Sequence, residues 1–183
     1  MSRFEGMVYE AVLRIDHTAL HGREIRRSRL LDERIFNARP EAHAGALAGA
    51  LSRLYEDLSA RARAARRLSR NASLVARWTL VYDIYSPKLR RFVEVDEKQH
   101  FSAPRLERIR RHGALYPASF MTRLKALSPS RDLSPPHRDE QRAYRDAARE
   151  LIPAAYGLAA TVRLDEFSLR DLKDPSILLE ELL

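Results

Sequence analysis

Acidic and basic side chains alternate along one short segment of the chain, RFVEVDEK at residues 91–98. In a β-strand alternate residues share a face, so Glu94, Asp96 and Lys98 are expected to project to the same side. His100 follows them and is expected to extend that row. Carboxylates, an ammonium group and an imidazole gathered on one face can bind a divalent metal, neutralise a phosphate and carry a proton.

The segment that precedes this row predicts a partner strand. Residues 76–85 (ARWTLVYDIY) are rich in aromatic and β-branched side chains, and Pro87 marks a turn between the two segments. Together they predict an antiparallel hairpin, which brings Asp83 beside Glu94 or Asp96. Two or three carboxylates packed this closely need a compensating cation.

A divalent metal would supply that compensation, because carboxylate oxygens suit Mg²⁺ or Mn²⁺. The ion would polarise a phosphodiester and acidify a bound water, and Lys98 would help to position that water. An alternating row of charges is also typical of a solvated strand face, which is the alternative interpretation. Asp83 favours a site, because its neighbours suggest a buried strand, where an unpaired carboxylate is costly.

Asp83, a spacer of ten residues and the run EVDEKQHF at 94–101 resemble the PD-(D/E)xK, or restriction-endonuclease-like, nuclease superfamily. The run is most similar to the branch with an E-x-D-x-x-x-H signature, which includes small proteins similar to very-short-patch repair endonucleases. The resemblance implies a mixed sheet flanked by helices and Mg²⁺-dependent cleavage of DNA. It also implies metal ligation by Asp83 and by Glu94 or Asp96, with Lys98 as the basic residue.

Two registers of this motif are open. If Glu94 is the second acid, the lysine position of the motif holds Asp96. If Asp96 is the second acid, then Asp96, Glu97 and Lys98 fit the D-x-K form, and we favour this register with Glu94 as a further ligand. Members of the superfamily often carry an acid on a preceding helix, for which Glu56 is the candidate.

Composition narrows the classes of protein and of binding partner that remain possible. The 183 residues include 33 Lys and Arg against 25 Asp and Glu, a net charge of +8 that favours a polyanionic partner. Zero cysteines exclude disulfides, zinc-thiolate sites, iron–sulfur clusters and thiol nucleophiles. The sequence lacks the apolar run of a signal peptide. It also lacks an apolar run of roughly 20 residues, which a membrane span needs, so we expect a cytoplasmic protein.

Two groups of arginines are candidates for holding nucleic-acid phosphates. The first follows the proposed site directly and comprises Arg105, Arg108 and Arg111. The second recurs at steps of four, three and four along a predicted helix, with a glutamine beside it: Arg138, Gln141, Arg142, Arg145 and Arg149. Acids alternate with this second group, so an ordinary solvated helix face is an equal interpretation. DNA is the expected partner and RNA the alternative, and a double-strand cut would need a homodimer or successive nicks.

These elements predict a single α/β domain over 1–183, with a restriction-endonuclease-like core. Its mixed central sheet contains the antiparallel hairpin and is flanked by helices, with extra N-terminal helices. The expected parts are a mainly helical region at 1–70, a core at 72–165 and a closing helix at 168–183. Helical periodicity marks 41–68, 103–112, 118–127 and 139–152, AATVRL at 159–164 reads as a short strand, and 4–15 fits a helix better than a strand.

The function predicted is that of a Mg²⁺-dependent endonuclease. One rival is a nuclease-fold protein that binds nucleic acid without cutting it. The other is a helical interaction module in which the predicted strands do not form.

Overall fold

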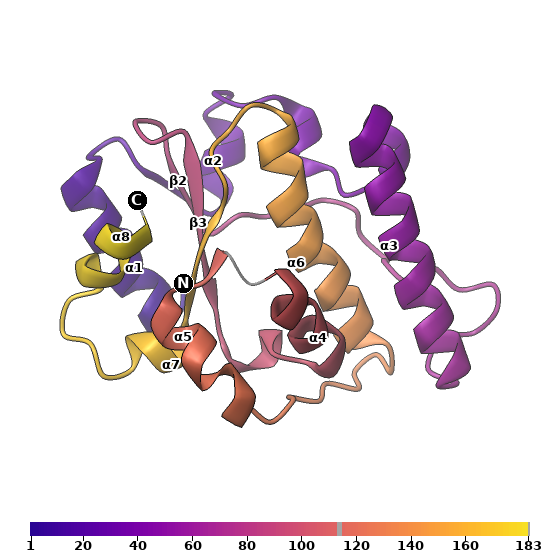
Figure 1. Cartoon of the computed structure of the whole chain (residues 1–183). Coiled ribbons are helices and arrows are strands. Elements are labelled where there is room, and N and C mark those ends of the chain that lie inside the picture. The colour runs from indigo at the N-terminus through magenta and orange to yellow at the C-terminus, as the bar shows by residue number, and fades with distance from the viewer. Residues whose placement is uncertain (113–114, 183) are drawn as a thin grey trace.

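The computed structural model describes residues 1–112 and 115–182, which form a sheet covered by helices on both faces (Figure 1). The sheet has four strands in the order β1 to β4: Leu20–His21, Ile84–Ser86, Arg91–Asp96 and Val162–Asp165. β3 and β4 run parallel and the other neighbours are antiparallel. The predicted α/β class, with a hairpin inside a mixed sheet, is confirmed.

The hairpin joins β2 to β3 in the register Ile84↔Val93. The first predicted strand is much shorter than expected, because residues 78–80 pair elsewhere. Leu80 N donates to Phe36 O at 2.8 Å, and Thr79 forms an isolated bridge with Asn37. This segment therefore stays extended but lies against the chain at 36–38 instead of joining the sheet.

The second strand is also shorter than predicted, because it ends at Asp96. Residues Lys98–His100 form a 3₁₀ turn, η3, which His100 N closes by donating to Glu97 O at 2.8 Å. The prediction that Lys98 continues the alternation of the strand is therefore wrong.

The helices form two layers (Figure 1). On one side lie α3 (Gly45–Ala64), α4 (Ala103–His112) and α6 (Arg138–Ala155), and on the other lie α1 (Arg3–Ile15) and α8 (Ser176–Leu182). The shorter helical elements are α2 (Arg23–Arg27), η1 (Glu33–Phe36), η2 (Pro40–Ala42), α5 (Ala118–Arg123), η5 (Leu124–Ala126) and α7 (Glu166–Leu169). The predicted closing helix is thus divided between α7 and α8, and its last residue lies outside the described part of the chain.

A capping box explains why the N-terminal segment forms a helix and not a strand. Ser2 Oγ accepts the N–H of Glu5, and Glu5 Oε2 accepts the N–H of Ser2. The helical stripe then buries Val8 and Val12 in the layer that includes Val93 and its neighbours on the sheet. The same capping box orients Glu5 at the start of α1, where it becomes part of the candidate site.

The two faces of β3 have different surroundings. Val93 and Val95 pack with α1 and α8, as their place in the alternation predicted. Phe92 lies on the other face, in the cluster with α3 and α6, and stacks on Tyr82 with ring centroids 3.9 Å apart. The alternation therefore directs Glu94 and Asp96 toward the α6 side, where both are buried.

Asp16 ties α1 to the hairpin turn. It follows α1 and is buried, and its carboxylate accepts from Ser86 Oγ at 2.6 Å and from Lys88 N at 2.9 Å. Burial acts to raise the pKa of Asp16, but these hydrogen bonds and two from Thr18 outweigh it and hold the pKa well below its ordinary value.

We expect Asp16→Asn to lower the free energy of unfolding by about 2 kcal/mol at pH 7, because an amide nitrogen cannot accept these hydrogen bonds. The lowered pKa means that this contribution is complete above about pH 4 and is lost as the pH falls further. Urea unfolding at pH 7 and pH 3 measures the difference, which should shrink at the lower pH. Asp57→Asn, on the exposed face of α3, is the control. Equal effects of the two variants would contradict the assignment.

Within the described residues, no helix has both the length and the apolar character needed to cross a bilayer.

Candidate functional site

The hairpin places Asp83 directly beside Glu94. Asp83 N donates to Glu94 Oε1 at 3.1 Å, and Val95 N donates to Asp83 Oδ2 at 2.9 Å. The side chains thereby replace backbone partners just where the β2–β3 ladder stops. The prediction that Asp83 lies beside one of the two acids is confirmed, and the neighbour is Glu94.

Both carboxylates open on a cavity of about 210 Å³ between the start of α1, the hairpin and α6. Its lining is mostly polar and comprises Ser2, Glu5, Asp83, Glu94, Val95, Glu97, His100 and Arg149. The cavity thus contains four carboxylates, one imidazole and one guanidinium. Carboxylate oxygens are the ligands that hard divalent cations prefer, although among the described residues of this lining no three acidic or imidazole side chains bring ligand atoms within 4.8 Å of one another.

Burial and mutual repulsion disfavour ionisation of the two central acids. Burial, and after it the neighbouring Asp83, raise the pKa of Glu94 to about 8 against the opposing charges of Arg149 and Arg163. Burial also raises the pKa of Asp83, although Arg149 and the Val95 N–H oppose the shift. Arg149 Nε is 3.5 Å from Glu94 Oε2, a long contact for an ion pair. A further positive charge in the cavity would relieve both acids.

Glu5 was not anticipated from the sequence as part of a site. Its Oε1 lies 2.6 Å from His21 Nε2, and its Oε2 accepts the Ser2 N–H at 2.9 Å, so the carboxylate is held at the cavity. The S-x-x-E pattern at 2–5 indicates a helix start, but it contains no information about the cavity. Glu56, the candidate for an acid on a preceding helix, is exposed on α3 and does not line the cavity.

Asp96 and Lys98 are both outside the cavity lining. Asp96 is buried behind it, where Arg163 Nε donates to Asp96 Oδ2 at 2.7 Å and Tyr116 Oη donates to the same oxygen. Burial acts to raise the pKa of Asp96, but Arg163 outweighs it and lowers the pKa to about 2. Lys98 is exposed on η3. The geometry therefore separates the D-x-K pair and brings Asp83 and Glu94 together instead.

Asp96, His100 and Asp146 form a second group, one that could hold a metal ion. One ligand atom of each lies within 4.8 Å of the others, and Asp146 on α6 was not anticipated from the sequence. His100 Nδ1 lies 3.1 Å from Asp146 Oδ2, and the two acids raise the pKa of His100 although burial acts to lower it. Arg163 and Arg149 already pair with the two acids of this group, and metal binding would require a neutral imidazole at His100. We therefore regard it as a structural ion-pair network that orients His100 toward the cavity.

The arginines after the proposed site are mostly committed to this network. Arg105 is buried, and its guanidinium pairs with Glu150 at 2.5 Å. The prediction that Arg105 holds a phosphate at the surface is therefore corrected, because a fully buried guanidinium is inaccessible to a nucleic acid. Arg108 shares Glu150 at 2.9 Å, and Arg111 is exposed beside Glu107.

The arginine stripe of α6 binds the protein's own backbone. The guanidinium groups of Arg138, Arg142, Arg145 and Arg149 donate to the carbonyls of Ser134, Gln99, Arg77 and Val81, respectively. Gln141 is buried and donates to Leu74 O at 3.2 Å, so its prediction as a nucleic-acid contact is corrected. These side chains hold α6 against loops that lack regular backbone partners.

Comparison of the whole chain with protein-family models, curated proteins and solved structures found no match. The function is therefore inferred from the geometry of the site.

Proposed function

We propose that this chain is a Mg²⁺- or Mn²⁺-dependent endonuclease of the PD-(D/E)xK type that hydrolyses phosphodiester bonds, with DNA as its substrate. The observation that carries the proposal is the pairing of Asp83 with Glu94 at one cavity. A buried carboxylate beside a half-buried one, both with raised pKa values and with a guanidinium 3.5 Å from Glu94 to compensate them, is a costly arrangement. A hard divalent cation would offset this cost.

Each lining residue has a role in this proposal. Asp83 and Glu94 would hold the metal, and Glu5 adds a third carboxylate from α1. When bound, the ion would supply Lewis acidity toward a phosphoryl oxygen and lower the pKa of a water. Arg149 would neutralise the phosphate, which is the role that the family resemblance implied for Lys98. His100, oriented by Asp146, would carry the proton.

The experiment is incubation of the purified protein with supercoiled plasmid, single-stranded DNA and RNA, each in Mg²⁺, Mn²⁺ or EDTA. We expect nicking or cutting in either metal and none in EDTA. Glu94→Gln should abolish the activity, and Glu56→Gln, which removes an exposed carboxylate of the same type, should retain it. Cleavage that persists in EDTA or in Glu94→Gln would refute the proposal, as would the absence of cleavage on all three substrates.

The rival that binds without cutting has one observation in its favour, because the lysine of the motif lies outside the cavity. It predicts nucleic-acid binding that is equal in EDTA and Mg²⁺ and yields no product. The helical-module rival required that the strands do not form, and the four-stranded sheet contradicts that premise.

Metal binding should be detectable without activity. We expect Mn²⁺ at about 100 times its Kd to raise the Tm of the wild type by roughly 5–10 °C and to leave the Tm of Glu94→Gln unchanged. In EDTA the raised pKa of Glu94 means that stability falls as the pH rises from about 4.5 toward 8, since the folded state then holds the extra proton. Glu94→Gln should lack this fall. Equal Mn²⁺ shifts in both proteins would contradict metal ligation by Glu94.

A further inference from the structure

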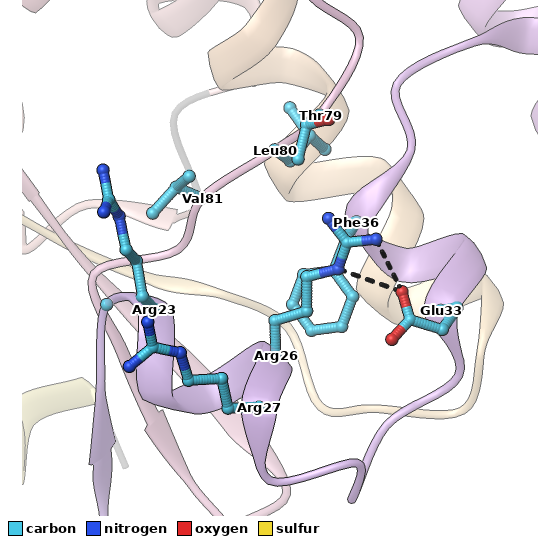
Figure 2. Close-up of a pocket in the computed structure, with 9 residues that line it drawn as sticks. Arg23, Arg26, Arg27, Glu33, Phe36, Thr79, Leu80 and Val81 are labelled. Atoms are coloured by element: carbon cyan, nitrogen blue, oxygen red, sulfur yellow. Dashed lines mark hydrogen bonds and ion pairs between the residues drawn. The ribbon is translucent and has the colours of Figure 1, made fainter.

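A groove rich in arginine runs between α2, η1 and the extended segment at 76–81 (Figure 2). It consists of two adjoining hollows of about 440 and 540 Å³, which share Arg26, Glu33, Phe36 and Thr79 in their linings. The arginines that line it are Arg23, Arg26, Arg27, Arg34, Arg39 and Arg77. Glu33 is the one acid of this lining among the described residues. The groove is therefore strongly positive.

All six of these arginines are exposed, unlike Arg105 of α4 and Arg142 and Arg149 of α6. Arg26 pairs with Glu33, as the dashed lines in Figure 2 show. In the described part of the chain, Arg23, Arg27 and Arg77 have no acidic side chain within ion-pair distance. An uncompensated cluster of guanidinium groups on a concave surface favours a polyanion.

An aromatic ring lies in the same groove. Trp78 is half-buried, rests against Tyr55 with ring centroids 5.4 Å apart, and has the guanidinium of Arg39 5.7 Å from its ring centre. A positive groove with an aromatic side chain is the arrangement on which single-stranded nucleic acids bind, because the bases stack on rings while the backbone follows the charges.

The groove lies close to the candidate site along the chain. Val81 lines the groove and Asp83 lines the cavity, and two residues of extended chain span at most about 7 Å. Gly22, which also lines the groove, donates its N–H to Asp83 O at 2.8 Å. A strand that follows the groove would therefore pass close to Asp83.

We propose that this groove binds a single strand of nucleic acid, with its phosphates on Arg23, Arg27 and Arg77 and its bases against Trp78. The strand continues into the cavity, so the substrate class of the site is single-stranded or locally unpaired nucleic acid. Only this last step rests on the proposed function. The binding itself does not require metal or cleavage.

Trp78 is the one tryptophan of the chain and reports on the groove without any substitution. The experiment titrates oligothymidylate into the protein in EDTA while recording tryptophan emission and the anisotropy of a labelled oligonucleotide. We expect binding that changes the Trp78 emission, and at least tenfold weaker binding of a duplex of the same length. Binding that leaves the emission unchanged would overturn the proposal, as would tighter binding of the duplex.

Charge-removing variants test the contacts. We expect the triple variant Arg23→Gln, Arg27→Gln, Arg77→Gln to bind at least tenfold more weakly. The slope of log K against log salt should fall by about 2, at about 0.7 per phosphate contact. The matched control removes three exposed arginines of α3 and the turns beyond it, Arg53→Gln, Arg63→Gln and Arg70→Gln, and should change affinity less than threefold. Equal losses in the two triple variants would show a general charge effect and overturn the proposal.

The two proposals fail in different ways. If the groove variants lose binding but the wild type cuts nothing in any metal, the proposed function is wrong and the groove stands. If cleavage depends on metal and on Glu94 but binding is insensitive to the groove variants, the groove is wrong and the proposed function stands.

Discussion

Arg163→Met is expected to lower the free energy of unfolding by about 3–5 kcal/mol. Arg163 lies on β4 opposite Glu94 in the β3–β4 ladder and is completely buried. Its guanidinium donates to both oxygens of Asp96 and lies 3.7 Å from Asp146 Oδ1. Methionine fills the volume of the stem but leaves Asp96 as a buried charge with less compensation, which is the costly case.

Urea unfolding of Arg163→Met, Asp96→Asn and the double variant measures this interaction as a cycle. The double variant should be less destabilised than the sum of the single ones, because removing both charges leaves neither unpaired. The control is Arg61→Met, which breaks the exposed pair with Glu107 and should cost no more than about 1 kcal/mol. A cost below about 1 kcal/mol for Arg163→Met, or strict additivity, would contradict the role of Arg163 in the network.

The same network predicts acid sensitivity. Because the pKa of Asp96 is lowered to about 2, its contribution to stability is complete above about pH 4 and is lost as the pH falls toward 2. The Asp96→Asn variant should therefore approach the stability of the wild type in acid.

Asp83→Asn is expected to lower the rate of metal-dependent cleavage by at least about 100-fold, because it would remove one of the carboxylates proposed to hold the metal. Lys98→Ala is expected to lower it less than about threefold, because the ammonium group is exposed on η3 and does not line the cavity. The comparison separates the two registers of the motif. The expected result would place the second acid of the motif at Glu94 and its positive charge at Arg149.

Single-turnover cleavage at saturating Mg²⁺ measures both variants, with circular dichroism and Tm as checks that each one folds. Asp83→Glu is a further control, since it keeps the charge but moves it, and should recover part of the metal binding that Asp83→Asn loses. A loss in Lys98→Ala as large as that in Asp83→Asn would restore the D-x-K register and contradict the assignment made from the geometry.

Local features of the sequence predicted the hairpin correctly. The turn at Pro87 and the change to a two-residue period predicted that Asp83 lies beside Glu94 or Asp96, and the register of the hairpin makes Glu94 the neighbour. Both depend on interactions between residues close in sequence. The ends of the strands were not predictable in this way, because residues 78–80 pair with the chain at 36–38, which lies about 40 residues earlier.

The rest of the site depends on distant segments. Glu5 comes from α1 and Arg149 from α6, and nothing in their own neighbourhoods indicates that they share a cavity with Asp83. The contacts of the arginines on α6 were equally hard to predict from the sequence. A guanidinium on a helix has the same periodicity whether it faces solvent or an irregular loop, so the stripe of α6 resembled a nucleic-acid surface although it binds backbone carbonyls.

The sequence by itself determined the class of fold, the hairpin and the position of Asp83 beside one of two acids, because backbone geometry decides which neighbouring side chains share a face. Only the tertiary structure decided which charges are buried and which remain exposed. That outcome depends on which segments cover a face, and here β4 brings Arg163 against Asp96 while α2 leaves Arg23 and Arg27 exposed. Charge type and spacing alone carry no information about that packing.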